Sequence, residues 1–267
     1  MSEPDIIVEK NDKPEASRAL SAEAREQIAE IARRQRKAKG VLMQAVNFVG
    51  GQVEDGLKLL PQKVRLQLNE VARKALRQSY DVAAKSRDGM GQRIASDRAH
   101  KVMGTVSGAV GGFGGLPTAI AELPVATTLI FRAVQSVAAE YGEDPLSEET
   151  RLECLAVFGA GGPGSDDDGV DTSFVGARLS LSGVAVNKLI SKVAPKFAAV
   201  LSQKLATQTV PVLGAAAGAG TNYAFLDYYV SIAHVHFGLR QMVRNHDEKA
   251  VIDEFHRVLA AADLPQT

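Results

Sequence analysis

The stretch VMGTVSGAVGGFGGLPTAIAELPVATTLIF, residues 102–131, contains one charged residue, Glu122, in 30 positions. A second stretch, residues 205–239, also contains one charged residue, Asp227, in 35 positions. Both stretches are rich in glycine and alanine, and neither shows the alternating apolar pattern of a β-strand. Together with the amphipathic segments around them, they predict a multi-helix bundle with two Gly/Ala-rich apolar helical segments packed centrally.

The composition of the whole chain also favours helices. Hydrophobic residues make up 45% of the 267 residues, which is enough for a sizeable core, whereas aromatic residues make up 5% and tryptophan is absent. A β-sandwich would be richer in aromatic and β-branched residues. We therefore expect an all-α fold with a disordered polar tail over residues 1–20 and a single helical domain over residues 21–264.

Capping residues and prolines set the expected helix boundaries. Ser21 is a predicted N-cap, and the helix that follows it is expected to end near Gly40. An amphipathic helix is expected from Pro61 to about Arg87. Because proline disfavours a helix interior, prolines are expected to separate the later helices. The later helices are expected at about residues 125–141, 147–158, 173–193, 195–207 and 248–262. The second apolar stretch is expected to continue as a helix to about residue 244.

Glycines recur every four residues in both apolar stretches. On a helix this spacing makes a flat stripe that lets another backbone approach closely, as in transmembrane packing, but buried helices of a soluble core can show the same pattern. Pro117 and Pro124 divide the first stretch into pieces shorter than the 20 or so residues that a span requires. Three arrangements of these stretches are compatible with the sequence: a helix that spans a membrane, an interfacial or re-entrant segment, and the core of a soluble protein. The glycines concerned are Gly104, Gly108, Gly112 and Gly115, the last spaced from Gly111, and Gly214 and Gly218 in the second stretch.

The two lone carboxylates are candidates for a functional site, because an isolated buried carboxylate is costly and requires a partner. For Glu122 the expected partners are Arg132, Arg151 or a helix N-terminus. For Asp227 they are a tyrosine hydroxyl or His234. A carboxylate held in a pocket or a bilayer would be functional, whereas a structural ion pair or a helix cap is the more common use of such a residue.

Further charged residues gather around Tyr141, where one helix is expected to end and another to begin. Paired carboxylates can carry out acid–base catalysis or bind a cation. A helix end followed by a helix start requires similar residues for capping, so this interpretation is the stronger one. The predicted polar cluster consists of Glu122, Arg132, Glu140, Asp144, Glu149, Arg151, Asp227 and His234.

No metal or cofactor site is expected. His234 and His236 are two residues apart and would point to nearly opposite faces of a helix, unlike a zinc-binding pair. The acidic run Asp166–Gly169 does not fit a calcium loop, because glycine and valine fall at its first and last ligand positions. Cys154 lies in an amphipathic stretch and is expected to be a buried, inert thiol.

Charge is unevenly distributed along the chain, although the formal net charge is zero. Residues 1–101 contain 20 Lys or Arg against 14 Asp or Glu, and residues 102–267 contain 11 against 17. A zero net charge gives no support for nucleic-acid binding, whereas a basic amphipathic helix can lie on anionic lipid. A solvated charged face would have the same composition. The basic run proposed for lipid contact is Arg33, Arg34, Arg36, Lys37 and Lys39.

Three stretches of the chain resemble the EcsC family. They are GTVSGAVGGFGGLPTAIAELPVATTLIFRAVQSVAAEYGED (residues 104–144), ETRLECLAVFGAGG (149–162) and VPVLGAAAGAGTNYAFLDYYVSIAHVHFGLRQ (210–241). The family takes its name from a gene beside those of an ABC transporter linked to secretion, and no catalytic residues carry over from it. The resemblance implies an α-helical bacterial protein associated with a membrane.

We therefore expect a non-catalytic, membrane-associated protein that supports a transport or secretion system. Its partners would be membrane lipid or a membrane protein, and no nucleic acid is expected. The charged N-terminal residues lack the apolar run of a signal peptide, so a cytoplasmic location, peripheral at the inner face of the cell membrane, is expected. Two alternatives stay open. One is a soluble hydrolase that acts on lipid through acidic residues in a helix-lined pocket, and the other is a soluble scaffold with both apolar stretches in its core.

Overall fold

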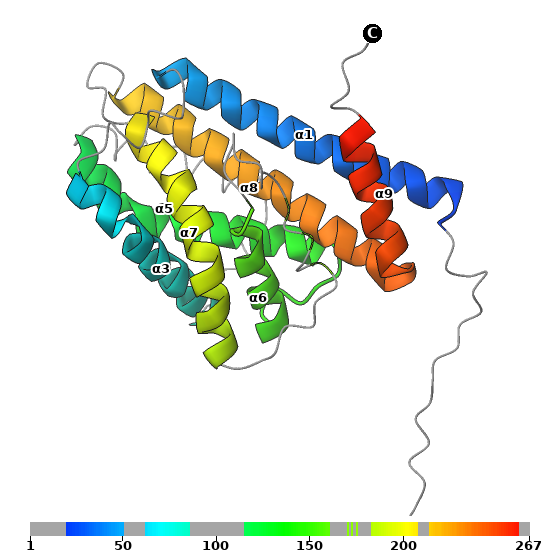
Figure 1. Cartoon of the computed structure of the whole chain (residues 1–267). Helices are drawn as coiled ribbons and strands as arrows, with labels where there is room; N and C mark the ends of the chain where they lie inside the picture. Colours follow the sequence, from blue (N-terminus) through cyan, green and yellow to red (C-terminus); the bar gives the residue numbers. More distant parts are fainter. Residues whose placement is uncertain are drawn as a thin grey trace, which may run out of the picture.

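The computed structural model describes residues 20–50, 62–85, 115–160, 170, 172, 175, 183–207 and 214–261. Across this part of the chain the backbone forms seven α-helices and no strand, which confirms the predicted all-α bundle (Figure 1). The helices are α1 (Ala22–Gly50), α3 (Gln62–Lys85), α5 (Gly115–Glu140), α6 (Glu148–Val157), α7 (Gly183–Thr207), α8 (Gly214–Asn245) and α9 (Glu248–Ala261).

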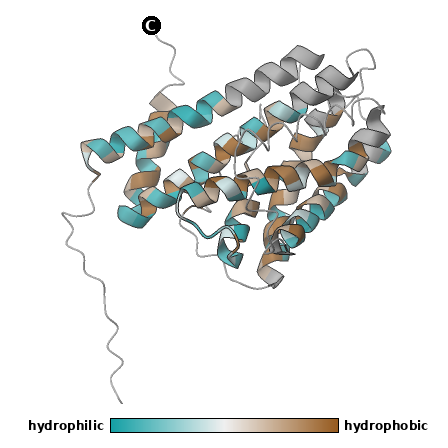
Figure 2. Ribbon diagram, turned by 180° about the vertical axis from the view of Figure 1, so that it is seen from behind, coloured by the Kyte–Doolittle hydropathy of each residue, from teal (hydrophilic) through white to brown (hydrophobic). Residues whose placement is uncertain are grey.

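Helix α8 lies at the centre of the bundle. It contacts α1, α5, α6, α7 and α9, and most of residues 228–239 are buried. Helix α5 lies beside it and also packs against α3. Along most helices, hydrophobic and hydrophilic residues alternate as the helix turns, as expected for amphipathic helices (Figure 2). The described parts of both apolar stretches therefore belong to long helices within the bundle.

Aromatic rings from four helices meet in the main core. The ring of Phe158, just after α6, lies 5.1 Å from that of Phe197 on α7, 5.0 Å from that of Tyr229 on α8 and 6.1 Å from that of Phe131 on α5. All four side chains are fully buried. Because each aromatic side chain buries about 150–250 Å², this group accounts for a large part of the apolar surface removed from water.

The predicted N-cap Ser21 is confirmed, and Ser147 caps α6 in the same way. Ser21 Oγ accepts a hydrogen bond from the backbone N–H of Ala24 at 3.0 Å, and Ser147 Oγ accepts one from that of Thr150 at 3.1 Å. Each bond satisfies a donor that the first turn of a helix leaves without an intrahelical partner. Helices α6 and α9 consequently lie within one residue of their predicted bounds.

Three predicted helix breaks are wrong. Helix α1 continues through Gly40, α5 runs through Pro124, and α7 runs through Pro195. Pro117 lies in the first turn of α5, where proline is tolerated because its missing N–H has no intrahelical acceptor. An interior proline costs about 3 kcal/mol and an interior glycine about 1 kcal/mol, but tertiary packing supplies most of the stability of a long helix and outweighs these amounts.

Two further predictions fall outside the described residues. These are the polar tail, apart from Leu20, and the start of a helix at residue 173. Helix α7 is described from Gly183 onward.

A close approach between α1 and α8 occurs at Gly238. A Cβ atom at this position would lie 3.2 Å from Cδ1 of Ile31 and 3.6 Å from Cε1 of Tyr141. Cδ1 of Ile31 is the end of a flexible side chain and can shift by a few tenths of an ångström. One methyl group can therefore be accommodated, whereas a branched side chain cannot.

We expect Gly238→Leu to lower the free energy of unfolding by about 1–3 kcal/mol, because the added atoms overpack a tight contact. Gly238→Ala is the control, and its free energy of unfolding should stay within about 1 kcal/mol of wild type, because alanine has the higher helix propensity. Urea unfolding followed by circular dichroism measures both values. If the leucine variant were as stable as wild type, the close contact between α1 and α8 would be wrong.

Candidate functional site

Helices α5 and α8 run side by side in the same direction. Near their starts, Nδ2 of Asn222 donates a hydrogen bond to Oε1 of Glu122 at 2.7 Å. Toward their ends, Nδ1 of His234 lies 3.3 Å from the hydroxyl oxygen of Tyr141. Both helix starts therefore lie at one end of the bundle. A Gly-rich stretch of the sequence precedes the start of α5, and the first two turns of α8 contain Gly214, Gly218 and Gly220.

We name this end of the bundle the Gly-rich end; it lies on the left in Figure 1. Helices α3, α5 and α8 begin there, and α1 and α7 end there. Two polar contacts per pair fix these directions. Ser79 pairs with Thr128 at 3.2 Å and Arg132 donates to the carbonyl of Val82 at 3.3 Å, so α3 and α5 are parallel. Arg73 donates to Ser191 at 3.1 Å and Arg77 to Asn187 at 3.0 Å, so α3 and α7 are antiparallel. The Gly-rich end is defined by residues 50, 62, 115, 207 and 214.

Large apolar side chains are exposed near the Gly-rich end. Val125 is 56% exposed and Tyr223 is 44% exposed, and each follows a residue of the Glu122–Asn222 hydrogen bond within one helical turn. Apolar side chains at the surface often mark a contact with a membrane or a partner when they gather in one place. Val125 and Tyr223 lie about three turns from the starts of α5 and α8.

One segment in the described part of the chain is long and apolar enough to cross a membrane. It is Ile120–Glu140 of α5, and 50% of that window is buried inside the protein. The core helix of a soluble bundle has the same length and composition, so this property alone does not distinguish a span from a core helix.

The predicted packing residues are described only in part. Gly104, Gly108 and Gly112 lie outside the described residues. The others stand in helical backbone: Gly115 and Gly214 begin α5 and α8, Pro117 and Gly218 lie within the first two turns, and Pro124 lies inside α5.

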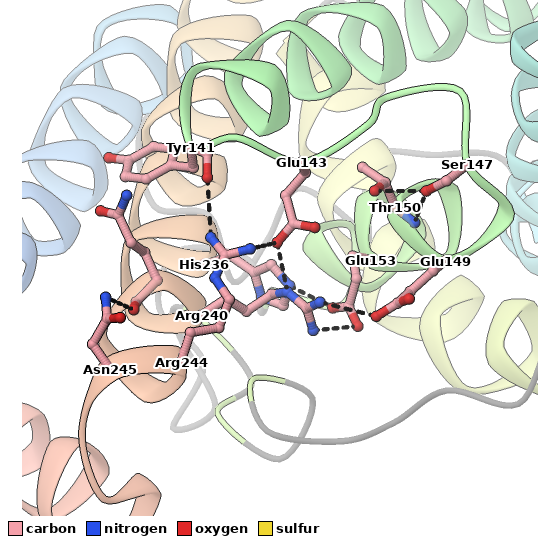
Figure 3. A network of polar contacts seen from close by, with 11 residues as sticks. Tyr141, Glu143, Ser147, Glu149, Thr150, Glu153, His236, Arg240, Arg244 and Asn245 are labelled. Carbon is pink, nitrogen blue, oxygen red and sulfur yellow. Dashed lines mark hydrogen bonds and ion pairs between the residues drawn. The ribbon is translucent and has the colours of Figure 1, made fainter.

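A network of charged side chains lies toward the other end of α8, where α8 meets α6 and the turn after α5 (Figure 3). At its centre is Glu153, whose side chain is 0% exposed. One carboxylate oxygen accepts a hydrogen bond from Nη1 of Arg240 at 2.7 Å, and the other lies 2.8 Å from Nε2 of His236, which is 2% exposed. A buried carboxylate is tolerated only with such partners, so these contacts fix α6 against α8.

Two arginines extend this network to the turn between α5 and α6. Oε1 of Glu143 accepts from Nε of Arg240 at 3.4 Å and from Nη1 of Arg244 at 2.8 Å. Nη2 of Arg244 also donates to the backbone carbonyl of Tyr141 at 3.0 Å. Glu149 lies 3.4 Å from Nη2 of Arg240, but its side chain is 57% exposed, so this pair contributes little.

The geometry of the network is that of a structural ion cluster. Both oxygens of Glu153 are engaged by protein side chains. The residues of the network line neither the small apolar hollow beside Tyr229 nor the groove between α3 and α7. Within the described residues, no group of three or more His, Cys, Asp or Glu side chains is placed to hold a metal ion.

The structure distributes the predicted polar cluster over separate places. Glu122 lies at the Gly-rich end, and its hydrogen-bond partner on α8 is an amide rather than one of the predicted arginines. Arg132 donates to the backbone carbonyl of Val82 on α3 at 3.3 Å. The guanidinium carbon of Arg151 lies 4.6 Å from the ring centre of Tyr80. These two arginines therefore join α5 and α6 to α3.

The remaining members of the cluster lie nearer the turn or along α8. Glu140 is exposed at the end of α5, and Asp144 accepts a hydrogen bond from a backbone N–H two residues later at 3.0 Å. Asp227 is partly buried on α8, and His234 contacts the tyrosine at the end of α5. Of the predicted residues, Glu149 is the one that the structure joins to the charged network.

The sequence-based prediction missed Glu153, His236 and Arg240. The available signal was a charged residue between apolar neighbours on a helix, which predicts a buried ion pair. Their partners could not be assigned from spacing, because Glu153 is 83 residues from His236 and 87 residues from Arg240.

Some residues of the basic run on α1, which was predicted to contact lipid, form hydrogen bonds within the protein instead. Arg33 donates to a glutamate of α1 at 2.7 Å, and Arg36 donates to a backbone carbonyl of α9 at 3.4 Å. Arg34 and Lys37 are exposed, whereas the side chain of Lys39 lies outside the described part of the molecule.

Cys154 is fully buried beside this network. Burial, and next to it the negative charge of Glu153, raise the pKa of the Cys154 thiol well above its usual range. A thiol that is both buried and protonated is a poor nucleophile.

We expect Glu153→Ala to lower the free energy of unfolding by about 3–5 kcal/mol, because the change leaves buried partners of a charge cluster unsatisfied. Glu149→Ala is the matched control in the same helix. It should cost less than about 1 kcal/mol, since its ion pair is exposed. Chemical unfolding measures both, and equal losses would contradict the central position of Glu153.

Cys154 should not react with an aromatic disulfide reagent in the native protein at mildly alkaline pH, because the thiol is buried and its pKa is raised. The reagent should titrate one thiol per chain after unfolding in denaturant, since the sequence contains one cysteine. Fast reaction of the native protein would show that the interior around α6 is open to solvent.

Comparison with known proteins gives one match. The model of the EcsC protein family matches residues 25–242, which include the Gly-rich end and Glu153, His236 and Arg240 of the charged network. No curated protein and no solved structure matches the chain significantly. Because the family model covers most of its length, the chain belongs to the EcsC protein family.

Proposed function

We propose that this protein is a non-catalytic, membrane-associated helical protein whose Gly-rich end meets lipid at the inner face of the cell membrane. In that position it would support a transport or secretion system, as the family resemblance implies. One observation carries the proposal. The parallel α5–α8 pair places the starts of both low-charge helices at one end of the bundle, and Val125 and Tyr223 are exposed about three turns from these starts.

The physical support is the gain from removing apolar surface from water. Full burial of one large apolar side chain contributes about 1.5–3 kcal/mol, and micromolar affinity corresponds to about 8 kcal/mol. A few apolar side chains from this end are thus enough for reversible binding. Tyr223 suits the membrane–water interface, because tyrosine has an apolar ring and a polar tip.

The charged network supports a defined orientation. Glu153, Arg240 and Arg244 lie toward the end of the bundle opposite the Gly-rich end. The buried carboxylate and its paired arginines are costly to place in hydrocarbon, whereas the first turns of α5 and α8 contain no charged residue before Glu122 and Asp227. We therefore expect the Gly-rich end, and not the end that contains the charged network, to contact the membrane.

The hydrolase alternative receives less support from the described residues. It requires Glu122 and the acidic residues near Tyr141 to line one pocket. Nineteen residues of helix and helix end separate these two positions, which corresponds to about 28 Å at 1.5 Å per residue. We therefore do not propose an enzymatic function.

Flotation with phosphatidylcholine vesicles at high salt tests the proposal, because salt screens charge contacts and leaves apolar insertion. We expect wild type to float, and Val125→Asp and Tyr223→Asp each to weaken binding by about tenfold or more, since each removes apolar contact and adds a charge at the interface. Leu146→Asp is the matched control. It changes another exposed apolar side chain, one that lies between α5 and α6, and should bind as wild type does.

Two outcomes would contradict the proposal. Wild type that binds no vesicles, neutral or anionic, even at low salt, would exclude membrane association of the purified protein. Equal weakening by Leu146→Asp and Tyr223→Asp would show that the Gly-rich end is not the contact.

A further inference from the structure

Helices α3 and α7 lie side by side and antiparallel, and together they form one face of the bundle (Figure 1). Nη1 of Arg73 donates to Oγ of Ser191 at 3.1 Å, and Nη1 of Arg77 donates to Oδ1 of Asn187 at 3.0 Å. Between the helices runs an open groove of about 620 Å³. Its polar lining consists of Arg73, Lys74, Arg77, Gln78, Asn187 and Ser191, together with the carboxylates Glu70 and Asp81.

This α3–α7 face is strongly basic in a chain whose net charge is zero. The two helices contain ten Lys or Arg residues against two acidic residues, whereas α1 contains six against three. The acidic residues of the face are Glu70 and Asp81, both on α3, and α7 has none. Of the ten basic residues, those whose side chains the structure describes are Lys63, Arg73, Lys74, Arg77, Lys188, Lys192 and Lys196.

The spacing of these cations is unfavourable for the helix alone. Lys188, Lys192 and Lys196 follow one another at intervals of four, so they share one side of α7. Like charges at this spacing destabilise a helix. A surface that concentrates positive charge in this way attracts an anionic partner.

The donors around the groove fit phosphate oxygens. Arginine presents a planar fork of N–H groups that matches phosphate, and lysine adds a mobile positive charge. Arg73 and Arg77 donate to the neutral acceptors Ser191 and Asn187 at the groove, and Nε of Arg77 also pairs with Oδ2 of Asp81 at 3.1 Å. Exchange of a neutral acceptor for a phosphate oxygen makes both partners of the hydrogen bond charged, which strengthens it.

The position of the face favours lipid over other phosphate-bearing partners. Helix α3 begins and α7 ends at the Gly-rich end, so the basic face extends to the end where Val125 and Tyr223 are exposed. A bilayer that lies against this face can thus contact cations and apolar residues at once. Nucleic acid would use the charge but would have no need of the neighbouring apolar side chains.

We propose that the α3–α7 face, centred on the groove at Arg73, Lys74 and Arg77, binds the phosphate head groups of anionic phospholipids. This inference rests on the proposed membrane association. It adds the lipid class, and it assigns the contact with anionic lipid to α3 and α7 rather than to the basic run of α1.

Paired charge reversals on the full chain separate the two basic surfaces. The test variant is Lys74→Glu/Lys188→Glu, with one exposed lysine on each helix of the face. The matched control is Arg34→Glu/Lys37→Glu on α1, which makes the same change in net charge at two exposed positions. Circular dichroism and thermal unfolding establish that both variants keep the helical fold.

Binding is measured at low salt by flotation with phosphatidylcholine vesicles that contain about one-third phosphatidylglycerol. Each basic residue near an anionic surface contributes enough that reversing two of them should weaken binding about tenfold or more. We expect this loss in the α3–α7 variant, and a loss of less than about threefold in the α1 variant, as screened long-range charge predicts. Added salt should weaken wild-type binding to these vesicles.

Several results would overturn the inference while leaving membrane association intact. They are wild-type binding that does not depend on phosphatidylglycerol, equal losses in both variants, or a loss confined to the α1 variant. Wild type that binds neither vesicle type removes the proposed function itself, and this is seen before any variant is compared. If wild type binds duplex DNA but no vesicles, and Lys74→Glu/Lys188→Glu abolishes that binding, the basic face is a nucleic-acid surface instead.

Discussion

The parallel pairing of α5 with α8 is the constraint on which the arrangement of this protein depends. Near the helix starts it includes the hydrogen bond from Asn222 to Glu122, and beyond the end of α5 it includes the bond from Arg244 to the carbonyl of Tyr141. Parallel helices begin at the same end, so the two low-charge stretches of the chain are brought together there. An antiparallel pair would have separated them by the length of the bundle.

The opposite end is fixed by charge in a buried setting. Glu153 has little exposure to solvent, and its two oxygens are engaged by Arg240 and His236. A buried ion pair gains little over well-packed apolar residues of similar size, but removal of one partner is expensive. The network therefore acts mainly on the position of α8 against α6, and it adds little to overall stability. Its cations also hold the turn between α5 and α6 through Glu143.

Local sequence signals predicted the fold class and the helices whose ends have their own caps. Ser21 and Ser147 each cap a helix through a bond to a backbone N–H three residues later, which is a short-range property. Pro124 and Pro195 were misread, because a helix packed on several sides tolerates a residue that would break an isolated one. The partners of Glu153 and Glu122 could not be predicted, since they come from α8, more than 80 residues away in the sequence. Spacing within one helix carries no information on such contacts.

Apolar and charged residues are concentrated in different parts of the molecule. The Gly-rich end combines low-charge sequence with exposed Val125 and Tyr223, and a strongly basic face runs from it along α3 and α7. Salt-sensitive attraction to anionic lipid and salt-resistant apolar contact would then act on neighbouring parts of one surface. Neither contact requires a catalytic residue. This is consistent with the wide separation of the acidic residues that a pocket would have needed to bring together.

The most direct test uses the absence of tryptophan from the natural sequence. A single tryptophan replaces Tyr223 in one protein and Leu146 in another, and its fluorescence is recorded with vesicles that contain brominated lipid. Membrane contact through the Gly-rich end predicts a blue shift and quenching at position 223 and an unchanged spectrum at position 146. Quenching at position 146 alone, or at neither position although the protein floats with the vesicles, would contradict membrane contact through the Gly-rich end.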